Sequence, residues 1–231
     1  MLTYLASSVF FYFTYYGLDE YAGNYFPEST KIVTKKYRIC NTVKSGTLAL
    51  LCIPGTQFLY QLAFYPELIT SDTLNFIGAV YTATDAAALV YNPNCHQSTL
   101  IHHVVVQLFY YYCWLMNFDM DQGAARGIGI YCILSSYAYL VNGRLALRFT
   151  SNKQLEHIVN EMSIFIYITS CVINWITQSY LVFGGLSMHI LERIIYLGAL
   201  GMTVNDDIFL IAFLRKIDNK KPIENSEVKQ H

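Results

Sequence analysis

The stretch DAAALVYNPNCHQSTLIHHVVVQLFYYYCWLMNFD, residues 85–119, decides the class of this protein. Between Asp85 and Asp119 it contains no charged residue, and apolar and aromatic side chains surround two adjacent histidines, His102 and His103. Ionisable groups are costly to place in an apolar segment of helical length, and there they usually mark a functional site with a named partner. We therefore expect the histidine pair to form a site and Asp85 to be its partner.

The composition identifies the apolar surroundings as a membrane. Of the 231 residues, 54% are hydrophobic and 13% are charged, whereas roughly a quarter of the residues are charged in soluble domains. The 20 tyrosines and 14 phenylalanines suit the boundary between lipid and water. No extended basic face remains once the loops are assigned, so nucleic acid is not an expected partner. The six cysteines form no Cys-x-x-Cys pair and the six histidines lack box spacing, so we expect no metal and no bound cofactor.

Apolar runs recur along the whole chain at lengths suited to membrane helices, which need about 20 residues. They predict an all-α, polytopic membrane protein with about seven transmembrane helices around a central cavity. The runs are Leu2–Tyr16, Ser45–Tyr65, Leu74–Tyr91, Thr99–Phe118, Ala124–Val141, Met162–Phe183 and Ser187–Leu214. The chain then divides into a first helix with a basic loop (1–44), a helical membrane domain (45–214) and a polar basic tail (215–231).

The distribution of lysine and arginine predicts the orientation. With seven spans, the basic clusters fall on one side, which the positive-inside rule assigns to the cytosol. The N-terminus is then lumenal or external and the C-terminus is cytosolic. A basic rim on this side would also attract the phosphates of coenzyme A. The clusters are Lys31, Lys35, Lys36, Arg38 and Lys44 in the first loop, Arg144, Arg148 and Lys153 in the fifth, and Arg215, Lys216, Lys220, Lys221 and Lys229 in the tail.

The same orientation brings polar side chains from four helices to one half of the membrane. At 1.5 Å per residue, Asp85 lies about 9 Å from the cytosolic end of its helix, and the histidine pair lies about 6–8 Å from that face. The polar residues of the last helix lie about 10–14 Å from it. Arg144, at a helix end, either extends to the interface or binds a substrate. The predicted substrate-binding set is Asn142, Arg144, Asn205, Asp206 and Asp207.

The histidine pair suggests acid–base or nucleophilic chemistry. Adjacent helical residues point about 100° apart, so His102 and His103 cannot both face one point. We expect one ring to face a cavity while the other hydrogen-bonds within the bundle. Asp85 would hold the working ring in one tautomer and stabilise its protonated form. Such an imidazole can act as a general base toward an amine or hydroxyl, or as a nucleophile toward a thioester, so His102, His103 and Asp85 are the catalytic candidates.

An Asp in the third helix, a short Asn/Pro loop and a His-His pair at the start of the next helix form a recognisable order. The matching segments are Tyr81-Thr82-Ala83-Thr84-Asp85, Leu100-Ile101-His102-His103, Leu134-Ser135-Ser136, Asn142-Gly143-Arg144 and Asn205. Over residues 44–214 this arrangement resembles the TLC-domain family of multispanning membrane lipid proteins. The resemblance implies a protein of the endoplasmic reticulum or another endomembrane that acts on or senses lipids. In the family's ceramide synthases, the His-His pair lies where an acyl group passes from acyl-CoA to a sphingoid amine.

The chain departs from the family pattern at three places. No Thr or Ser-Tyr follows the histidines at the synthase spacing, no His-Asp-x-x-Asp follows Arg126, and no Glu precedes Leu134-Ser135-Ser136 as in many non-synthase members. These departures favour a TLC-type protein of lipid homeostasis that binds or modifies a lipid or acyl chain in a cytosolic-leaflet cavity. The first alternative is a sphingoid-base N-acyltransferase with fatty acyl-CoA as co-substrate. The second is an ion or small-molecule transporter, which the lack of a repeated half disfavours. Membrane lipids are the expected partners, and a second copy of the chain, in a homodimer, is kept as a further candidate partner.

Overall fold

All the regular structure is helical in the part of the chain that the structure describes. The computed structural model describes residues 1–23, 32–65, 68, 70–93, 95, 97–116, 123–147, 153–185 and 188–218, and no strand occurs among them. The predicted all-α class is therefore confirmed. In chain order the elements are α1 (Leu2–Gly23), α2 (Ile32–Phe64), α3 (Ser71–Tyr91), α4 (Gln97–Leu115), α5 (Gly123–Ser136), α6 (Tyr139–Leu147), α7 (Lys153–Tyr180), the π-helical turn η2 (Leu181–Gly185) and α8 (Ile190–Asp218).

The first two apolar runs form longer helices than we expected. Helix α1 continues to Gly23 and has 22 residues, which is enough to cross a bilayer. Helix α2 begins at Ile32 rather than Ser45 and continues through Pro54 for 33 residues. The basic segment that we expected to be a loop is therefore largely the first part of a helix, because its cations find partners on neighbouring helices. Lys31 and the tail beyond residue 218 lie outside the described residues.

The fifth apolar run is divided between α5 and α6. At the break, the backbone N–H groups of Tyr137 and Ala138 donate to carbonyls three residues earlier, at 3.3 and 3.0 Å. The Ser136 hydroxyl donates to the carbonyl of Ile133 at 2.7 Å. Serine hydroxyls that bond the local backbone bend or interrupt helices. The Ser135-Ser136 pair therefore lies where the helix changes course.

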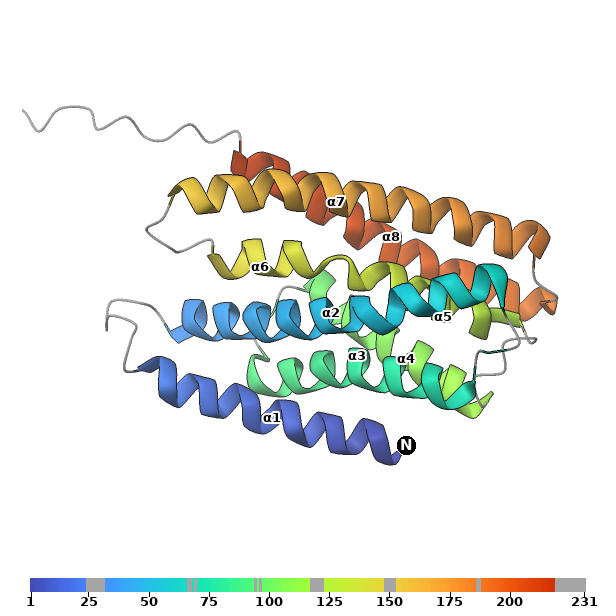
Figure 1. Cartoon of the computed structure of the whole chain (residues 1–231), viewed down its shortest axis with the longest axis horizontal. Helices are drawn as coiled ribbons and strands as arrows, with labels where there is room; N and C mark the ends of the chain where they lie inside the picture. The colour runs from blue at the N-terminus through green and yellow to red at the C-terminus, as the bar shows by residue number, and fades with distance from the viewer. Residues whose placement is uncertain are drawn as a thin grey trace, which may run out of the picture.

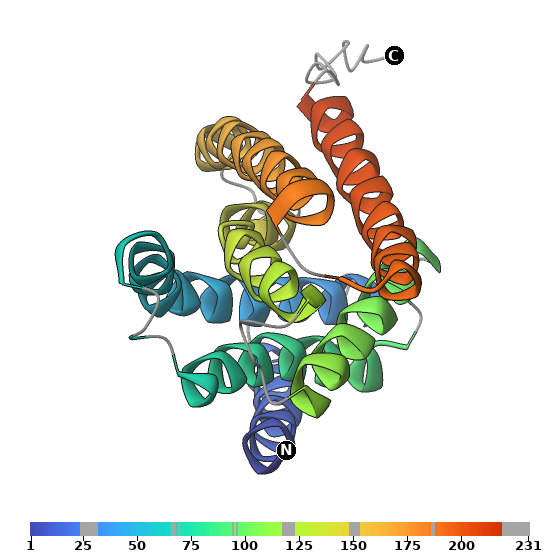
Figure 2. The same cartoon turned by 90° about the vertical axis from the view of Figure 1, so that its right-hand side faces the viewer.

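Helix α5 occupies the middle of the bundle. It contacts α2, α3, α4, α7 and α8, and Figure 2 shows α5 and α6 between a lower group that includes α1 and an upper pair, α7 and α8. Successive long helices run in opposite directions (Figure 1), so the C-terminal ends of α1, α3, α6 and α8 lie at the same end of the bundle. This is the end at which α2 begins.

Helix α1 packs along α3 on a stripe of small residues. Ala79, Ala83 and Ala87 are spaced four apart on α3 and are buried in one core cluster with Tyr15 of α1. Small side chains let two helices approach closely, which is a common packing mode in lipid. The hydroxyl of Tyr15 also donates to the carbonyl of Thr84 at 3.2 Å. Helix α1 is therefore an integral part of the bundle.

The outside of the bundle is strongly apolar. Large side chains such as Phe13, Ile53 and Phe165 are 67%, 73% and 72% exposed, and soluble monomers rarely expose apolar patches of the size that such residues form. Within the part of the chain that the structure describes, two helical stretches are long and apolar enough to cross a membrane by length and composition: His157–Gly184 and Ile190–Lys216. These features indicate association with a membrane.

Candidate functional site

Asp85, His103 and Lys44 lie together inside the bundle. The Asp85 side chain is fully buried, and its Oδ2 lies 3.1 Å from Nδ1 of His103. Its other oxygen, Oδ1, contacts the ammonium of Lys44 on α2. One carboxylate on α3 therefore faces a nitrogen from α2 on one side and a nitrogen from α4 on the other. The expected proximity of Asp85 to the histidine pair is present, and it involves His103.

His102 faces a different carboxylate. Its Nδ1 lies 3.3 Å from Oδ2 of Asp206 on α8. The ring centroids of His102 and His103 are 5.7 Å apart and their planes are inclined at 80°. The two rings thus address separate partners, as the 100° step between helical neighbours requires. Asp206 is 23% exposed and Asp85 is 0% exposed, so the His102–Asp206 pair is the more accessible of the two.

Lys44 is a site residue that the sequence interpretation missed. Because α2 begins at Ile32, the helix carries Lys44 into the bundle, where its side chain is only 15% exposed. Its ammonium also lies over the ring of Tyr81, 5.6 Å from the centroid. The signal in the sequence is the position of Lys44 directly before a long uncharged run. A lysine at such a position is by default expected to extend toward water, and only a partner on another helix reverses that expectation.

One ion pair balances the charge of the deeper part of the cluster. An ionised group taken out of water costs several kcal/mol unless it is paired, and its removal from a buried pair leaves the partner uncompensated. Lys44 and Asp85 form a neutral pair, so the buried carboxylate does not depend on a charged His103. The contact between His102 and Asp206 lies at the edge of the cluster, and it is an ion pair only when the imidazole is protonated. Among the described residues, no group of three or more His, Cys, Asp and Glu is arranged to hold a metal ion.

A narrow apolar cavity lies one helical turn deeper than the cluster. Its volume is about 30 Å³, which is room for one or two water molecules. Its lining includes Tyr81 of α3, Val106 of α4 and Thr203 of α8. Each lies about one helical turn from a residue of the cluster on the same helix: Asp85, His103 and Asp206, respectively. All three displacements point away from the end of the bundle at which α2 begins. The site therefore has ionisable groups at one level and an apolar space behind them.

Asp207 lies apart from its neighbour Asp206, among aromatic side chains. Its carboxylate accepts hydrogen bonds from the hydroxyls of Tyr167 and Tyr131, at 2.7 and 3.3 Å. The indole N–H of Trp175 donates to it at 3.4 Å. Because three donors from α5 and α7 occupy this carboxylate, Asp207 links helices of the bundle. The two adjacent acids of α8 thus lie in different surroundings, Asp206 against His102 and Asp207 among aromatic side chains.

The rest of the predicted substrate-binding set is spread over other parts of the bundle. Arg144 is buried, and its Nε donates to Oδ1 of Asn160 on α7 at 3.0 Å. The expectation that Arg144 extends to the interface is wrong, because α6 packs between α2 and α7. The amide of Asn142 donates to the carbonyl of Ala138 at 3.1 Å, and Asn205 is exposed on α8. Of the five residues, the structure brings Asp206 to the histidines.

The cations at the start of α2 are bound to the ends of other helices. Lys36 Nζ donates to the carbonyl of Tyr91, the last residue of α3, at 2.9 Å. Arg38 Nε donates to the carbonyl of Ala146, near the end of α6, at 3.2 Å. The last carbonyls of a helix have no partner within it and carry partial negative charge, so cations stabilise them. These contacts hold alternate helix ends at one face of the bundle.

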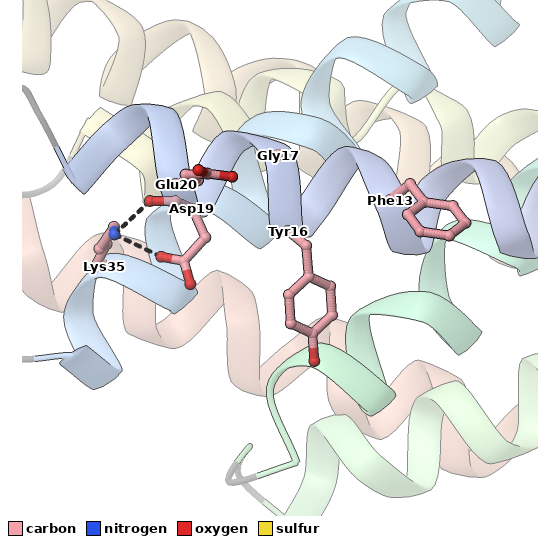
Figure 3. Close-up of a pocket in the computed structure, with 6 residues that line it drawn as sticks. All are labelled: Phe13, Tyr16, Gly17, Asp19, Glu20 and Lys35. Atoms are coloured by element: carbon pink, nitrogen blue, oxygen red, sulfur yellow. Dashed lines mark hydrogen bonds and ion pairs between the residues drawn. The ribbon is translucent and has the colours of Figure 1, made fainter.

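Lys35 binds the end of α1 in the same way (Figure 3). Its Nζ lies 2.6 Å from Oδ1 of Asp19 and donates to the Asp19 carbonyl at 2.5 Å. A pocket of about 630 Å³ opens to the surface beside this pair, and its described lining also includes Tyr16 and Glu20. The ammonium of Lys35 already has a carboxylate partner. Within this described lining, a phosphate would therefore find no uncompensated positive charge.

Comparison with known proteins gives no relative for this chain. No family model, no curated protein and no solved structure matches it. What the site can do follows from its own geometry, in which each of two histidines lies against a carboxylate beside an apolar cavity. A histidine oriented by a carboxylate can accept a proton and return it. The cavity behind the pair is smaller than a ligand pocket, so the chain of a lipid would have to lie between helices or along the apolar exterior.

Proposed function

We propose that this chain is a multipass membrane protein of the TLC type that binds or modifies a lipid or acyl chain and acts in lipid homeostasis. The observation that carries the proposal is the cluster of ionisable groups, each histidine against a carboxylate, inside a bundle whose exterior is strongly apolar. A lipid has a polar end and an apolar chain, and its polar end would meet this cluster while its chain lies against the apolar helices. The order of Asp85, His102 and His103 along two successive helices supports the family resemblance.

Seven membrane crossings are part of the proposal. The apolar exterior supports them, with α5 and α6 together forming the fifth crossing. The tyrosines of α1 and α4 lower the mean hydropathy of these helices but are well placed near an interface. The cations gathered at one end support a cytosolic C-terminus and a lumenal or external N-terminus. An endomembrane location, with the endoplasmic reticulum first, follows from the resemblance.

The pairing of each histidine with its own carboxylate supports the enzyme alternative as well. In that reaction the nitrogen of a sphingoid base attacks the thioester carbonyl of a fatty acyl-CoA. The new C–N bond forms as the C–S bond breaks, one histidine takes the proton of the amine, and that proton passes to the departing thiolate. We assign this histidine as His102, because the His102–Asp206 pair is the more exposed one.

One experiment tests both forms of the proposal. Full-length protein in nanodiscs is supplied with sphinganine and palmitoyl-CoA, and lipids that co-purify with it are identified by mass spectrometry. His102→Ala, His103→Ala and Asp85→Asn are compared with His189→Ala, a histidine exposed at the start of α8. We expect the wild type and His189→Ala to retain a lipid that the three site variants lose.

The outcomes separate the alternatives. A ceramide product formed by the wild type and missing in the three site variants would establish acyl transfer. A retained lipid without product would support lipid binding alone. The same lipid content in all variants, with no product from the wild type, would contradict the proposed function.

A further inference from the structure

We propose that Lys44 is a positioning residue of the histidine site, holding Asp85 so that the free edge of this carboxylate faces His103. The functional consequence rests on the proposed function, whereas the structural part stands by itself. Lys44 contacts Oδ1, and Nδ1 of His103 lies 3.1 Å from Oδ2. The carboxylate thus has a cation at one oxygen and the His103 ring close to the other, and it cannot turn without changing both contacts.

The direction of the Asp85 carboxylate depends on Lys44 more than on its other surroundings. The Asp85 side chain is 0% exposed, so bulk water does not reach its oxygens. Lys44 is fixed in turn, since its ammonium lies over the Tyr81 ring, one turn before Asp85 on the same helix. A compact ammonium between an aromatic face and a carboxylate is held by cation–π attraction as well as by charge.

A second lysine–aspartate pair on α2 provides the natural contrast. Lys35 and Asp19 also form an ion pair, at 2.6 Å, but their side chains are 21% and 29% exposed. Exposed ion pairs contribute little because water screens them, whereas a buried carboxylate that loses its cation stays uncompensated. The same substitution at Lys35 and at Lys44 therefore separates the loss of a lysine from the loss of this particular partner.

Removal of Lys44 is expected to disturb both histidines. Asp85 would retain His103 as its one ionisable contact among the described residues, so the carboxylate would be free to follow that ring. His103 is adjacent to His102 on α4, and a shift of its ring would change the 3.3 Å contact between His102 and Asp206. Lys44 thus acts on the ligand through Asp85 and His103 rather than by touching it.

The test compares four variants of the full-length protein in nanodiscs. Capture of a diazirine-bearing palmitoyl probe is measured by photocrosslinking for Lys44→Met, Lys44→Arg, Lys44→Met/Asp85→Asn and the control Lys35→Met. We expect Lys44→Met to capture about tenfold less probe, the change in affinity that a loss of about 1.4 kcal/mol of binding free energy produces. Lys44→Arg, which keeps the cation, should recover most of the capture, and Lys35→Met should match the wild type.

The double variant distinguishes positioning from folding. Lys44→Met/Asp85→Asn removes both charges, so it should regain the thermal stability lost by Lys44→Met. If it also regains probe capture, neither Lys44 nor the charge of Asp85 is needed for binding, which overturns this proposal together with the role of Asp85 in the proposed function. Probe capture by Lys44→Met equal to that of a folded wild type would overturn it as well.

A second measurement keeps the two proposals apart. The ¹⁵N spectrum of the imidazoles reports the surroundings of His103 whether or not a ligand binds. We expect the His103 signals to move in Lys44→Met and to stay in Lys35→Met. A wild type that captures no probe would count against the proposed function, and the spectrum would still decide the role of Lys44, since unchanged His103 signals in Lys44→Met would refute it.

Discussion

Gly127 on α5 lies against a buried polar network, and the substitution Gly127→Ala is expected to disrupt it. A Cβ at this position would lie 2.8 Å from the Tyr196 hydroxyl and 3.2 Å from Oε1 of Gln178. That hydroxyl donates to Gln178 Oε1 at 2.6 Å, and the Gln178 amide donates to the Gly127 carbonyl at 3.0 Å. Real Cβ atoms essentially never approach within 3.0 Å, so the Tyr196 ring has to move.

The expected loss follows from three contributions. Displacing Tyr196 leaves a buried amide oxygen without its donor, which costs about 1–3 kcal/mol. Forcing a methyl group into a packed interior adds about 1–3 kcal/mol. Replacing glycine by alanine within a helix returns about 0.5–1 kcal/mol. We therefore expect Gly127→Ala to lower the free energy of unfolding by about 3 kcal/mol, within a range of about 1–5 kcal/mol.

Reversible unfolding in mixed micelles, followed by circular dichroism, measures this change. Gly129→Ala is the matched control, because its Cβ would lie 3.7 Å from Leu74 Cδ2, an ordinary contact, and it should gain up to about 1 kcal/mol. Adding Tyr196→Phe to Gly127→Ala removes the clashing oxygen. The double variant should therefore lose less stability than the sum of the losses of the two single variants. Equal stability of Gly127→Ala and Gly129→Ala would refute the packing described for α5.

Three further predictions concern the other buried groups and the orientation. Tyr167→Phe should lower the free energy of unfolding by about 1–2 kcal/mol and Tyr131→Phe by less than about 1 kcal/mol, because the Tyr167 hydroxyl makes the shorter hydrogen bond to Asp207. Equal losses in thermal unfolding would contradict this order. Arg144→Met should lower the free energy of unfolding by about 2 kcal/mol or more, since it removes the donor to the Asn160 side chain inside the bundle. A change within about 0.5 kcal/mol, which is typical of surface positions, would place Arg144 at the surface instead. In sealed microsomes, added protease should remove a C-terminal tag and spare an N-terminal tag, and the reverse pattern would invert the proposed topology.

The sequence located the helices well wherever an apolar run ended at a local signal. The third run, expected from Leu74 to Tyr91, is a helix from Ser71 to Tyr91. Its start is fixed by Thr70, whose side chain accepts a hydrogen bond from the backbone of the first turn. Its end is fixed by the Asn-Pro sequence that follows, because the residue before a proline disfavours helical geometry. Such signals are contained in a few neighbouring residues.

The start of α2 could not be found in this way, because its determinants lie on other helices. A segment rich in lysine and arginine resembles a loop in hydropathy, yet Lys44 pairs with a residue 41 positions away. Arg38 bonds a carbonyl 108 positions away. The same limit applies to Asp206 and Asp207. Adjacent helical residues point about 100° apart, and only the rotation of α8 against its neighbours decides that Asp206 faces a histidine.

The use of these cations bears on how a ligand reaches the site. A basic rim was expected to attract the phosphates of coenzyme A, but Lys35, Lys36 and Arg38 bind helix ends and Lys44 binds a buried carboxylate. Lys35 and Lys44 are balanced by carboxylates, whereas Lys36 and Arg38 are oriented by helix-end carbonyls, which do not cancel a full charge. The exposed cations described at this end are Arg215 and Lys216 of α8. A ligand that enters sideways from the bilayer needs no field from these cations, whereas an acyl-CoA would be attracted by it, so a loss of probe capture at high salt would distinguish the second route from the first.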